Sequence, residues 1–298
     1  MVRQYKIHTN LDGTDDKVWD VTNGKVRFYQ PSNLGLQSTN NIWQSNGIGV
    51  MGTRSITQPQ IEFKLETFGE TLEENYQLMK DFVNDILNQK FVTLEYQTEI
   101  FQVYADLALA DVTKTEGYGK NGTFSEKITF DIITKWYTYE NLTFDMIKNG
   151  KVIAGKSKIY GGTAPGDYKY VKGTSYTYYG ESNIDRLSRW DIKDEIFSFI
   201  GILYPKLPKT PAGVRFLDDI GNEYTAIVFK TEQVQNYILI NTDVNDEIYQ
   251  GWNGTTPLNL FPVMDFERYR TRIIKKGQME LINLSKAEFK IKRKADFV

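Results

Sequence analysis

Residues 60–97 read QIEFKLETFGETLEENYQLMKDFVNDILNQKFVTLEYQ, and this stretch decides the fold class. Apolar side chains alternate with charged ones over 61–66 and with polar ones over 92–96, which is the pattern of strands with one buried face. Between these segments, apolar residues recur at spacings of four and three, as on one face of an amphipathic helix. The residues of this face are Leu72, Tyr76, Met79, Val83 and Ile86. The stretch therefore predicts a strand, a helix and a second strand.

The start of the helix is specified by its cap as well as by its period. Thr71 lies three residues before Glu74, which is the capping-box pattern. The apolar face could bind a partner, but a single helix that covers a sheet is the commoner arrangement. Alternating patterns recur over 103–109 and 128–132. Residues 1–137 are therefore predicted to form a domain of one sheet covered by one helix.

The segment WYTYENLTF, from Trp136 to Phe144, fits a strand that leaves the first domain and enters the next. It sets the predicted domains at 1–137 and 138–298. Beyond it, glycine and tyrosine crowd residues 149–180, a composition that favours hairpins and turns over a packed core.

After Trp190 the sequence shows short strand patterns separated by turns, such as DDIGNE at 218–223. This arrangement is typical of a β-sandwich. Residues 190–203, WDIKDEIFSFIGIL, also fit a helical spacing, but the following Pro205 and the β-branched residues favour a strand. The fold class predicted for the whole chain is mainly β with one N-terminal helix.

The composition excludes several kinds of chemistry. The chain has 298 residues with one histidine, no cysteine and no spacing typical of metal ligands. Catalysis by a thiol or by zinc is therefore not predicted, and a binding or assembly protein is favoured. The 36 Lys and Arg residues nearly balance the 38 Asp and Glu residues, and the net charge of −2 predicts no tight nucleic-acid binding.

The sequence shows no targeting or membrane segment. No apolar run approaches the about 20 residues that span a bilayer, and the N-terminus, MVRQYKIHTNLDG, lacks the features of a secretory signal. Synthesis and first use in the cytoplasm, with no membrane partner, are expected. The lack of cysteine agrees with a reducing compartment and equally suits a protein that later works outside the cell.

Two short motifs suggest ligands, and each has a simpler explanation. GIGVMG, at 47–52, matches the dinucleotide pattern GxGxxG, but Pro59 and a strand pattern follow where a helix would be needed. It is therefore interpreted as a flexible or bulged loop. DVNDE, at 243–247, is rich in oxygen ligands but lacks the glycine and the distal glutamate of an EF-hand loop, so calcium binding is a minor alternative.

The remaining acidic pairs and the histidine also favour structural roles. Asp15 and Asp16, like Asp218 and Asp219, lie near glycine in turn-like sequence and are predicted to form turns. His8 has no cysteine or second histidine beside it, so it is predicted as a surface or core residue before a ligand. No catalytic residue, cofactor or metal site is predicted.

The C-terminal run KAEFKIKRKADFV, at 286–298, is locally basic. Phe289 and Ile291 alternate with Lys290 and Lys292, which predicts a strand with one solvated face, whose lysines discourage pairing at a sheet edge. An arm that binds phosphate is the less favoured alternative.

Several segments together resemble a known family. In the first half these are RSITQPQIEFKLETF (54–68) and FSEKITFDIITKWYTYE (124–140). In the second half they are FIGILYPKLPKTPAGVRFLDDIGNEYTAIVF (199–229), YILINTDVNDEIY (237–249) and KKGQMELINL (275–284). Over nearly the whole chain, the sequence resembles the distal tail proteins (Dit) of long-tailed bacteriophages, most closely those of lactococcal siphophages.

The resemblance implies a structural protein of the viral baseplate, with no catalytic residues and no enzyme activity. It implies a homo-hexameric ring of N-terminal domains between the tail tube protein and the tail-tip protein, with a galectin-like C-terminal domain projecting outward. In larger members that domain has an extension that holds receptor-binding proteins, and residues 145–189 are its expected counterpart. The implied location is the virion tail tip, after assembly in the cytoplasm of the bacterial host.

The tyrosines of the expected extension are candidates for partner contact. Tyrosine combines apolar area with a hydroxyl group and loses little side-chain entropy, which suits it to interfaces. The candidates are Tyr168, Tyr170, Tyr176, Tyr178 and Tyr179.

Two other functions fit a tyrosine-rich β chain. A carbohydrate-binding β-sandwich module would use exposed aromatic side chains, but the one histidine, His8, lies outside the galectin-like domain, which puts galectin-type sugar recognition in doubt. A glycoside hydrolase would need two carboxyl groups about 5 to 9.5 Å apart, and no spacing in the sequence selects such a pair.

Overall fold

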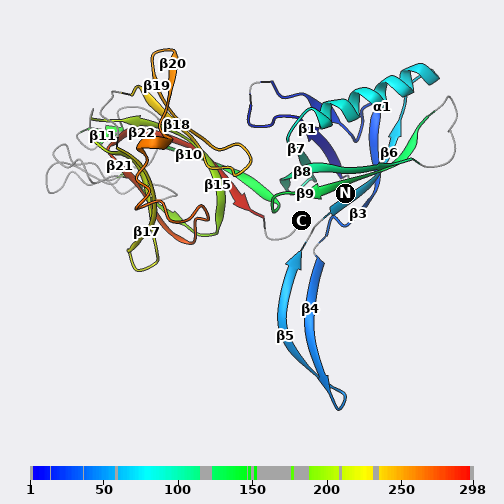
Figure 1. Ribbon diagram of the computed structural model, residues 1–298, viewed down its shortest axis with the longest axis horizontal. Coiled ribbons are helices and arrows are strands. Elements are labelled where there is room, and N and C mark those ends of the chain that lie inside the picture. Colours follow the sequence, from blue (N-terminus) through cyan, green and yellow to red (C-terminus); the bar gives the residue numbers. More distant parts are fainter. Residues whose placement is uncertain are drawn as a thin grey trace. The chain divides into compact units, whose positions relative to one another are not determined.

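The computed structural model describes residues 3–13, 15–35, 37–57, 60–114, 123–145, 147–148, 151–152, 176–177, 188–207, 210–230 and 235–295. This described chain is mainly β with one α-helix (Figure 1), which confirms the predicted fold class. The chain divides into two units, Met1–Thr138 with Ala295–Val298, and Tyr139–Lys294. None of the described helices has the length and apolar character that a bilayer crossing would require.

The first unit contains an antiparallel sheet with the strand order β2, β1, β7, β8, β9, β6 and β3. Its strands are β1 (Gln4–His8), β2 (Val18–Asp20), β3 (Val26–Ser32), β6 (Gln60–Thr67), β7 (Val92–Gln97), β8 (Gln102–Thr113) and β9 (Ser125–Ile132). Along β6, Ile61, Phe63 and Leu65 are buried and the charged residues between them are partly exposed, as the alternation predicts.

Helix α1 (Leu72–Leu87) begins at the predicted cap. The hydroxyl of Thr71 accepts a hydrogen bond from the backbone N–H of Glu74 at 3.1 Å. Phe82 and Ile86 are buried in the core of the first unit, and the ring of Phe82 meets that of Trp19 edge-on at 5.2 Å. The helix therefore covers the sheet with its C-terminal half.

The predicted apolar face is wrong in the first turn of the helix. Leu72 and Tyr76 are 53% and 60% exposed, and Asn75 is buried instead. The Asn75 amide accepts from the backbone N–H of Gly69 at 2.7 Å and donates to the carbonyl of Thr71 at 3.0 Å. Asn75 thus holds the segment that leads into the helix, and the residue of the first turn that faces the core is polar.

Strand β10 (Tyr137–Asp145) begins in the first unit and ends in the second. Tyr137 pairs with Tyr104 of β8, and its hydroxyl donates to the buried carboxylate of Asp106 at 2.7 Å. Tyr137, one of the aromatic residues that suggested a strand near the boundary, therefore anchors the chain where it leaves the first unit.

The second unit has two sheets. The order in one sheet is β10, β22, β15, β18, β19 and β20, and the order in the other is β13, β14, β21, β16 and β17. The strands are β13 (Tyr176–Thr177), β14 (Ser188–Ile192), β15 (Ile196–Pro205), β16 (Ala212–Leu217), β17 (Glu223–Phe229), β18 (Tyr237–Asn241), β19 (Ile248–Asn253), β20 (Thr256–Asn259), β21 (Gly277–Ile282) and β22 (Leu284–Lys294). A short pair, β11 (Ile147–Lys148) with β12 (Lys151–Val152), and a 3-10 turn, η2 (Phe261–Val263), complete it.

Phe199 joins the two sheets of the second unit. Its ring centroid lies 5.7 Å from that of Phe289 in the same sheet and 6.1 Å from that of Phe216 in the other. The three side chains belong to one buried apolar cluster that draws on both sheets. This is the core of a sandwich, as predicted.

Two sequence interpretations of the second unit are decided by the strand pairing. Residues 190–203 form strands and not a helix, because residues 190–192 belong to β14, which pairs with β21, and residues 196–203 belong to β15, which pairs with β18 and β22. The placing of the basic C-terminal strand at a sheet edge is wrong, because β22 lies between β10 and β15. Lys292 is tolerated there because its ammonium group binds the buried carboxylate of Asp243 at 2.8 Å.

Candidate assembly surface

The first unit also contains a hairpin formed by β4 (Gln37–Ser45) and β5 (Ile48–Thr57). Figure 1 shows it as a separate two-stranded ribbon, and the two strands pair with no other described strand. Asn46 and Gly47, which join them, both have positive φ, of 50° and 78°, as a type I′ turn requires. All side chains over 38–55 are exposed.

Apolar side chains occupy both faces of this hairpin. Residues opposite each other in the register share a face, and successive residues alternate between faces. Trp43 lies opposite Val50, with Ile48 on the same face, whereas Ile42 lies opposite Met51 on the other face. The exposed fractions of Trp43, Val50 and Ile48 are 68%, 63% and 70%. The hairpin is therefore a two-sided apolar surface.

Such a hairpin is not stable by its own contacts. A two-stranded hairpin alone in water is marginal, because it has no second layer to bury its side chains. Each of its strands has one edge without a described partner strand, and an exposed apolar edge is a template for pairing with another chain. The arrangement fits a surface that is covered by another protein chain.

The edges of the first unit's sheet are poorer pairing surfaces than the hairpin. Edge strand β2 has three residues. Edge strand β3 carries Pro31, which has no N–H to donate, next to Gln30 with a φ of 48°, and its register with β6 shifts between Tyr29 and Ser32. Free sheet edges are thus not the most suitable feature for contact between subunits.

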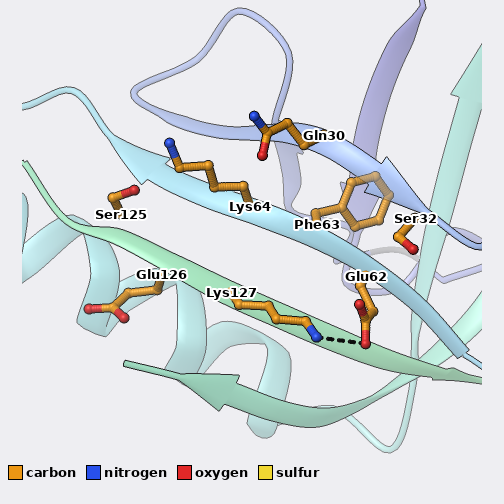
Figure 2. A pocket seen from close by; sticks show the side chains of 8 residues that line it. All are labelled: Gln30, Ser32, Glu62, Phe63, Lys64, Ser125, Glu126 and Lys127. Carbon is orange, nitrogen blue, oxygen red and sulfur yellow. Dashed lines mark ion pairs between the residues drawn. The ribbon is translucent and has the colours of Figure 1, made fainter. Parts of the chain in front are cut away.

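A hollow of about 400 Å³ lies on the face of β3, β6 and β9, and Figure 2 shows the side chains that line it. Its lining residues are Gln30, Ser32, Glu62, Phe63, Lys64, Ser125, Glu126 and Lys127. Lys127 Nζ lies 2.8 Å from Glu62 Oε1, and Lys64 Nζ lies 2.5 Å from Glu66 Oε1. Because both ammonium groups are paired with carboxylates of the same sheet, the hollow has the character of a charge-balanced surface and not of an anion or catalytic site.

The five candidate tyrosines are not tested by the structure. Tyr168, Tyr170, Tyr178 and Tyr179 lie outside the described residues. Tyr176 lies in β13, where its backbone pairs with Arg189, but its side chain is outside the description. Their role in partner contact stays a prediction.

The GxGxxG match lies in the hairpin and is mostly strand rather than a flexible loop, while the register shift between Asn40 and Ile42 puts a bulge-like irregularity next to Gly52. Gly47 is in the tight turn, and residues 48–52 belong to β5. The dipeptide Asn46–Gly47 flanked by apolar residues is the sequence signal that could have identified this surface.

The other acidic and imidazole groups have structural partners. Asp218 Oδ1 accepts from the backbone N–H of Ile220 and of Asn222, which forms a turn as predicted. In the DVNDE segment, the carboxylate of Asp243 is bound by Lys292. His8 is buried, and its two ring nitrogens lie within hydrogen-bond distance of two carboxylates. In the described part of the chain, no group of three or more His, Cys, Asp or Glu side chains is arranged to hold a metal.

Three partly exposed aromatic side chains of the second unit, Tyr204, Tyr237 and Trp252, lie against one another. The rings of Tyr237 and Trp252 are stacked at 5.8 Å, Tyr204 lies 6.3 Å from Tyr237, and Lys286 Nζ lies 5.2 Å from the centroid of Tyr204. Ring faces that cover one another are less available to a sugar, which does not favour a carbohydrate platform here.

Comparison with known proteins gives consistent matches over the whole chain. The family model described as distal tail protein, N-terminal domain, matches residues 4–133, and the one described as Dit, C-terminal domain, matches residues 135–298. The distal tail protein of Lactococcus phage p2 is 95% identical and that of Lactococcus phage SK1 is 92% identical, each over 100% of both chains.

Solved structures agree with these relatives. A chain in the structure of the phage p2 baseplate in its activated conformation with Ca has 95% identity and a TM-score of 0.80, with 100% of both chains covered. The Dit protein of phage SPP1 has 12% identity and a TM-score of 0.52 over 98% of this chain and 99% of that chain, so it shares the fold.

Proposed function

This chain belongs to the distal tail protein (Dit) family, and from that premise we propose that it assembles into a homo-hexameric ring through its first unit. Its role is that of a structural protein of the phage baseplate and not of an enzyme. The ring is the proposed form in which this role is performed, with the β4–β5 hairpin as the contact between neighbouring subunits.

The observation that carries the proposal is the two-sided apolar surface of the hairpin. Its side chains need a cover that the described chain does not provide. A patch that binds a different patch on the next identical subunit produces a head-to-tail contact, and such contacts close into a ring when the rotation between subunits allows it. A ring covers every hairpin with one kind of interface.

Helix α1 offers a surface that could receive part of the hairpin. Leu72, Tyr76 and Leu87 are more than half exposed. At 100° per residue they lie within about 60° of one another around the helix, beside the face that buries Phe82 and Ile86. An apolar stripe on one subunit and an apolar hairpin on the next are chemically complementary.

The finer partner assignments rest on family membership. We propose that the ring binds the tail tube protein on one side and the tail-tip protein on the other, and that it is assembled in the cytoplasm of the bacterial host. The region at about 145–189 is proposed as the extension that holds the receptor-binding protein, with the five tyrosines as contact residues. The division into a ring-forming domain, 1–137, and a galectin-like domain, 138–298, is proposed on the same basis, and the two units of the structure support it.

Light scattering on the purified full chain tests the ring. A hexamer gives a mass six times that of the 34.5 kDa subunit. A monomeric mass at all concentrations up to the millimolar range would contradict the proposal, and a stable dimer would contradict the head-to-tail contact. The same sample should bind DNA weakly and lose it on addition of salt, given the net charge of −2 per subunit.

A further inference from the structure

His8, the last residue of β1, has its ring between two carboxylates. Nδ1 is 2.6 Å from Oδ2 of Asp16, and Nε2 is 2.9 Å from Oε2 of Glu95. The side chains of His8 and Glu95 are 9% and 6% exposed. Because an ionised carboxylate only accepts hydrogen bonds, both ring nitrogens must donate, and this needs the doubly protonated imidazolium.

With the ring doubly protonated, His8 and Lys6 offset the charges of Asp16 and Glu95, and two further carboxylates lie nearby, Asp20 close to Lys6 and Asp12 close to Tyr104. Oε1 of Glu95 accepts from Lys6 Nζ at 3.1 Å and from Gln102 Nε2 at 3.0 Å, so that His8 and Lys6 are two cations facing the two carboxylates. Burial acts to raise the pKa of Glu95, but the hydrogen bonds from His8 and Lys6 outweigh it, and the pKa lies below its ordinary value. With a neutral imidazole, one negative charge would stay uncompensated in a mostly buried place, which is unfavourable.

The neighbouring strands add few other ionisable groups. On β2, Val18 lies opposite His8, and Asp20 lies opposite Lys6. On β7, Thr93 lies opposite His8. On β8, burial and the nearby charge of Glu95 raise the pKa of Tyr104, so this phenol stays neutral through the physiological range. Among these groups, the imidazole is the one whose two protonation states differ in how many hydrogen bonds the ring can donate to the two carboxylates.

The imidazole ring of His8 holds the chain segment that connects β1 to β2, residues 9–17. Oδ1 of Asp16 accepts from the backbone N–H of Asn10 at 3.0 Å, and the backbone N–H of Lys17 donates to the hydroxyl of Thr9 at 2.9 Å. At its far end, Lys17 Nζ lies 2.5 Å from Oδ2 of Asp85 on α1. The connection is thus fixed by the imidazolium at one end and by the helix at the other.

We propose that His8 is a pH-sensitive clasp: its imidazolium fastens the β1–β2 connection to β7 through Asp16 and Glu95, and loss of one ring proton releases the connection. In the released state the neutral ring keeps one hydrogen bond, and the other carboxylate turns to solvent. Asp16 is the partner that moves, because it lies in the connection, whereas Glu95 lies in the middle of a sheet and is held by Lys6 and Gln102.

Hydrogen exchange followed by mass spectrometry on the full chain, without a histidine tag, tests the clasp. After correction for the intrinsic pH dependence of exchange, protection of amides in residues 9–17 should fall about ten-fold or more between pH 5.5 and pH 8.5, as expected for loss of one charge-assisted hydrogen bond. Protection of residues 61–66 in β6 should stay constant and serves as the internal control. Equal protection of residues 9–17 at the two pH values overturns the proposal.

Two variants test whether the pH dependence of protection comes from the imidazole of His8. His8→Gln should show low protection of residues 9–17 at both pH values, and a ten-fold pH effect that persists in this variant overturns the proposal. The matched control Asp15→Asn changes an exposed neighbour and should keep the wild-type pH dependence. If His8→Gln does not fold, Asp16→Asn replaces the anionic partner in the connection and must abolish the pH dependence for the proposal to stand.

Discussion

Replacing Trp43 with serine tests the hairpin as the contact between subunits. Trp43 is 68% exposed in the single chain. An aromatic side chain has about 200 Å² of surface, so a neighbour that covers Trp43 removes about 140 Å² from water. At about 25 cal/mol per Å² this is about 3.5 kcal/mol, which corresponds to about 300-fold in the dissociation constant of one contact. Each subunit of a closed ring makes the contact twice, so the ring should come apart at far higher concentration than the wild type.

Sedimentation velocity over a dilution series measures this dissociation. The thermal unfolding of the variant's individual subunits should be close to that of the wild type, since Trp43 belongs to neither buried core. The matched control is Ile220→Ser, at a residue that is 82% exposed in a turn of the second unit. An unchanged dissociation constant for Trp43→Ser, or equal weakening by Ile220→Ser, would refute the assignment of the interface to the hairpin.

Three further predictions concern the cores and their charges. Lys292→Met should lower the free energy of unfolding by about 3 to 5 kcal/mol in chemical denaturation, because Asp243 keeps a buried charge without its cation; a loss below about 1 kcal/mol would contradict this. Ser198→Ala should raise that free energy by about 1 kcal/mol, since the buried hydroxyl of Ser198 has no hydrogen-bond partner in the described chain; a clear loss would show that the hydroxyl is bonded. The pKa of Glu95 lies below its ordinary value, so its contribution to stability is present at neutral pH and is lost as the pH falls through the lowered pKa. Glu95→Gln should flatten the fall in stability below about pH 4.5, and acid unfolding curves of equal slope would count against the network around His8.

Local patterns predicted the elements whose stability is local. The alternation in β6 and the cap at Thr71 both correspond to contacts within a few residues, and both are present in the structure. The inward face of the first helical turn was not predictable in this way, because Asn75 is buried for its bonds to the chain before the helix.

Interactions between residues far apart in the chain explain most of what the sequence did not indicate. Lys292 looks like a solvated residue until Asp243, 49 residues away, is brought to it. His8 has one partner 8 residues away and another 87 residues away, so no short motif marks the cluster. The position of β22 between β10 and β15 was not predicted for the same reason, because it depends on pairing with strands that are distant in the sequence.

The hairpin was missed for a different reason, since its described side chains are exposed and cover neither core of the chain. Residues 38–55 mix polar and apolar side chains on both faces and therefore lack the alternation of a strand that covers its own core. The turn at Asn46 and Gly47 was the available signal. The five candidate tyrosines lie where the composition favours turns, so no strand or helix period marks them.

The two-sided hairpin also has a consequence for the order of events during assembly. In the proposed assembly, a free subunit completes both of its cores alone, and its hairpin gains an apolar cover only when a neighbour binds. Ordering of the hairpin is then linked to subunit concentration by mass action, so the apparent melting temperature of this segment should rise as protein is concentrated while those of the cores stay fixed. In the proposed ring, the segment that becomes ordered last is the one that joins the subunits, and a free subunit exposes an adhesive apolar surface until a neighbour covers it.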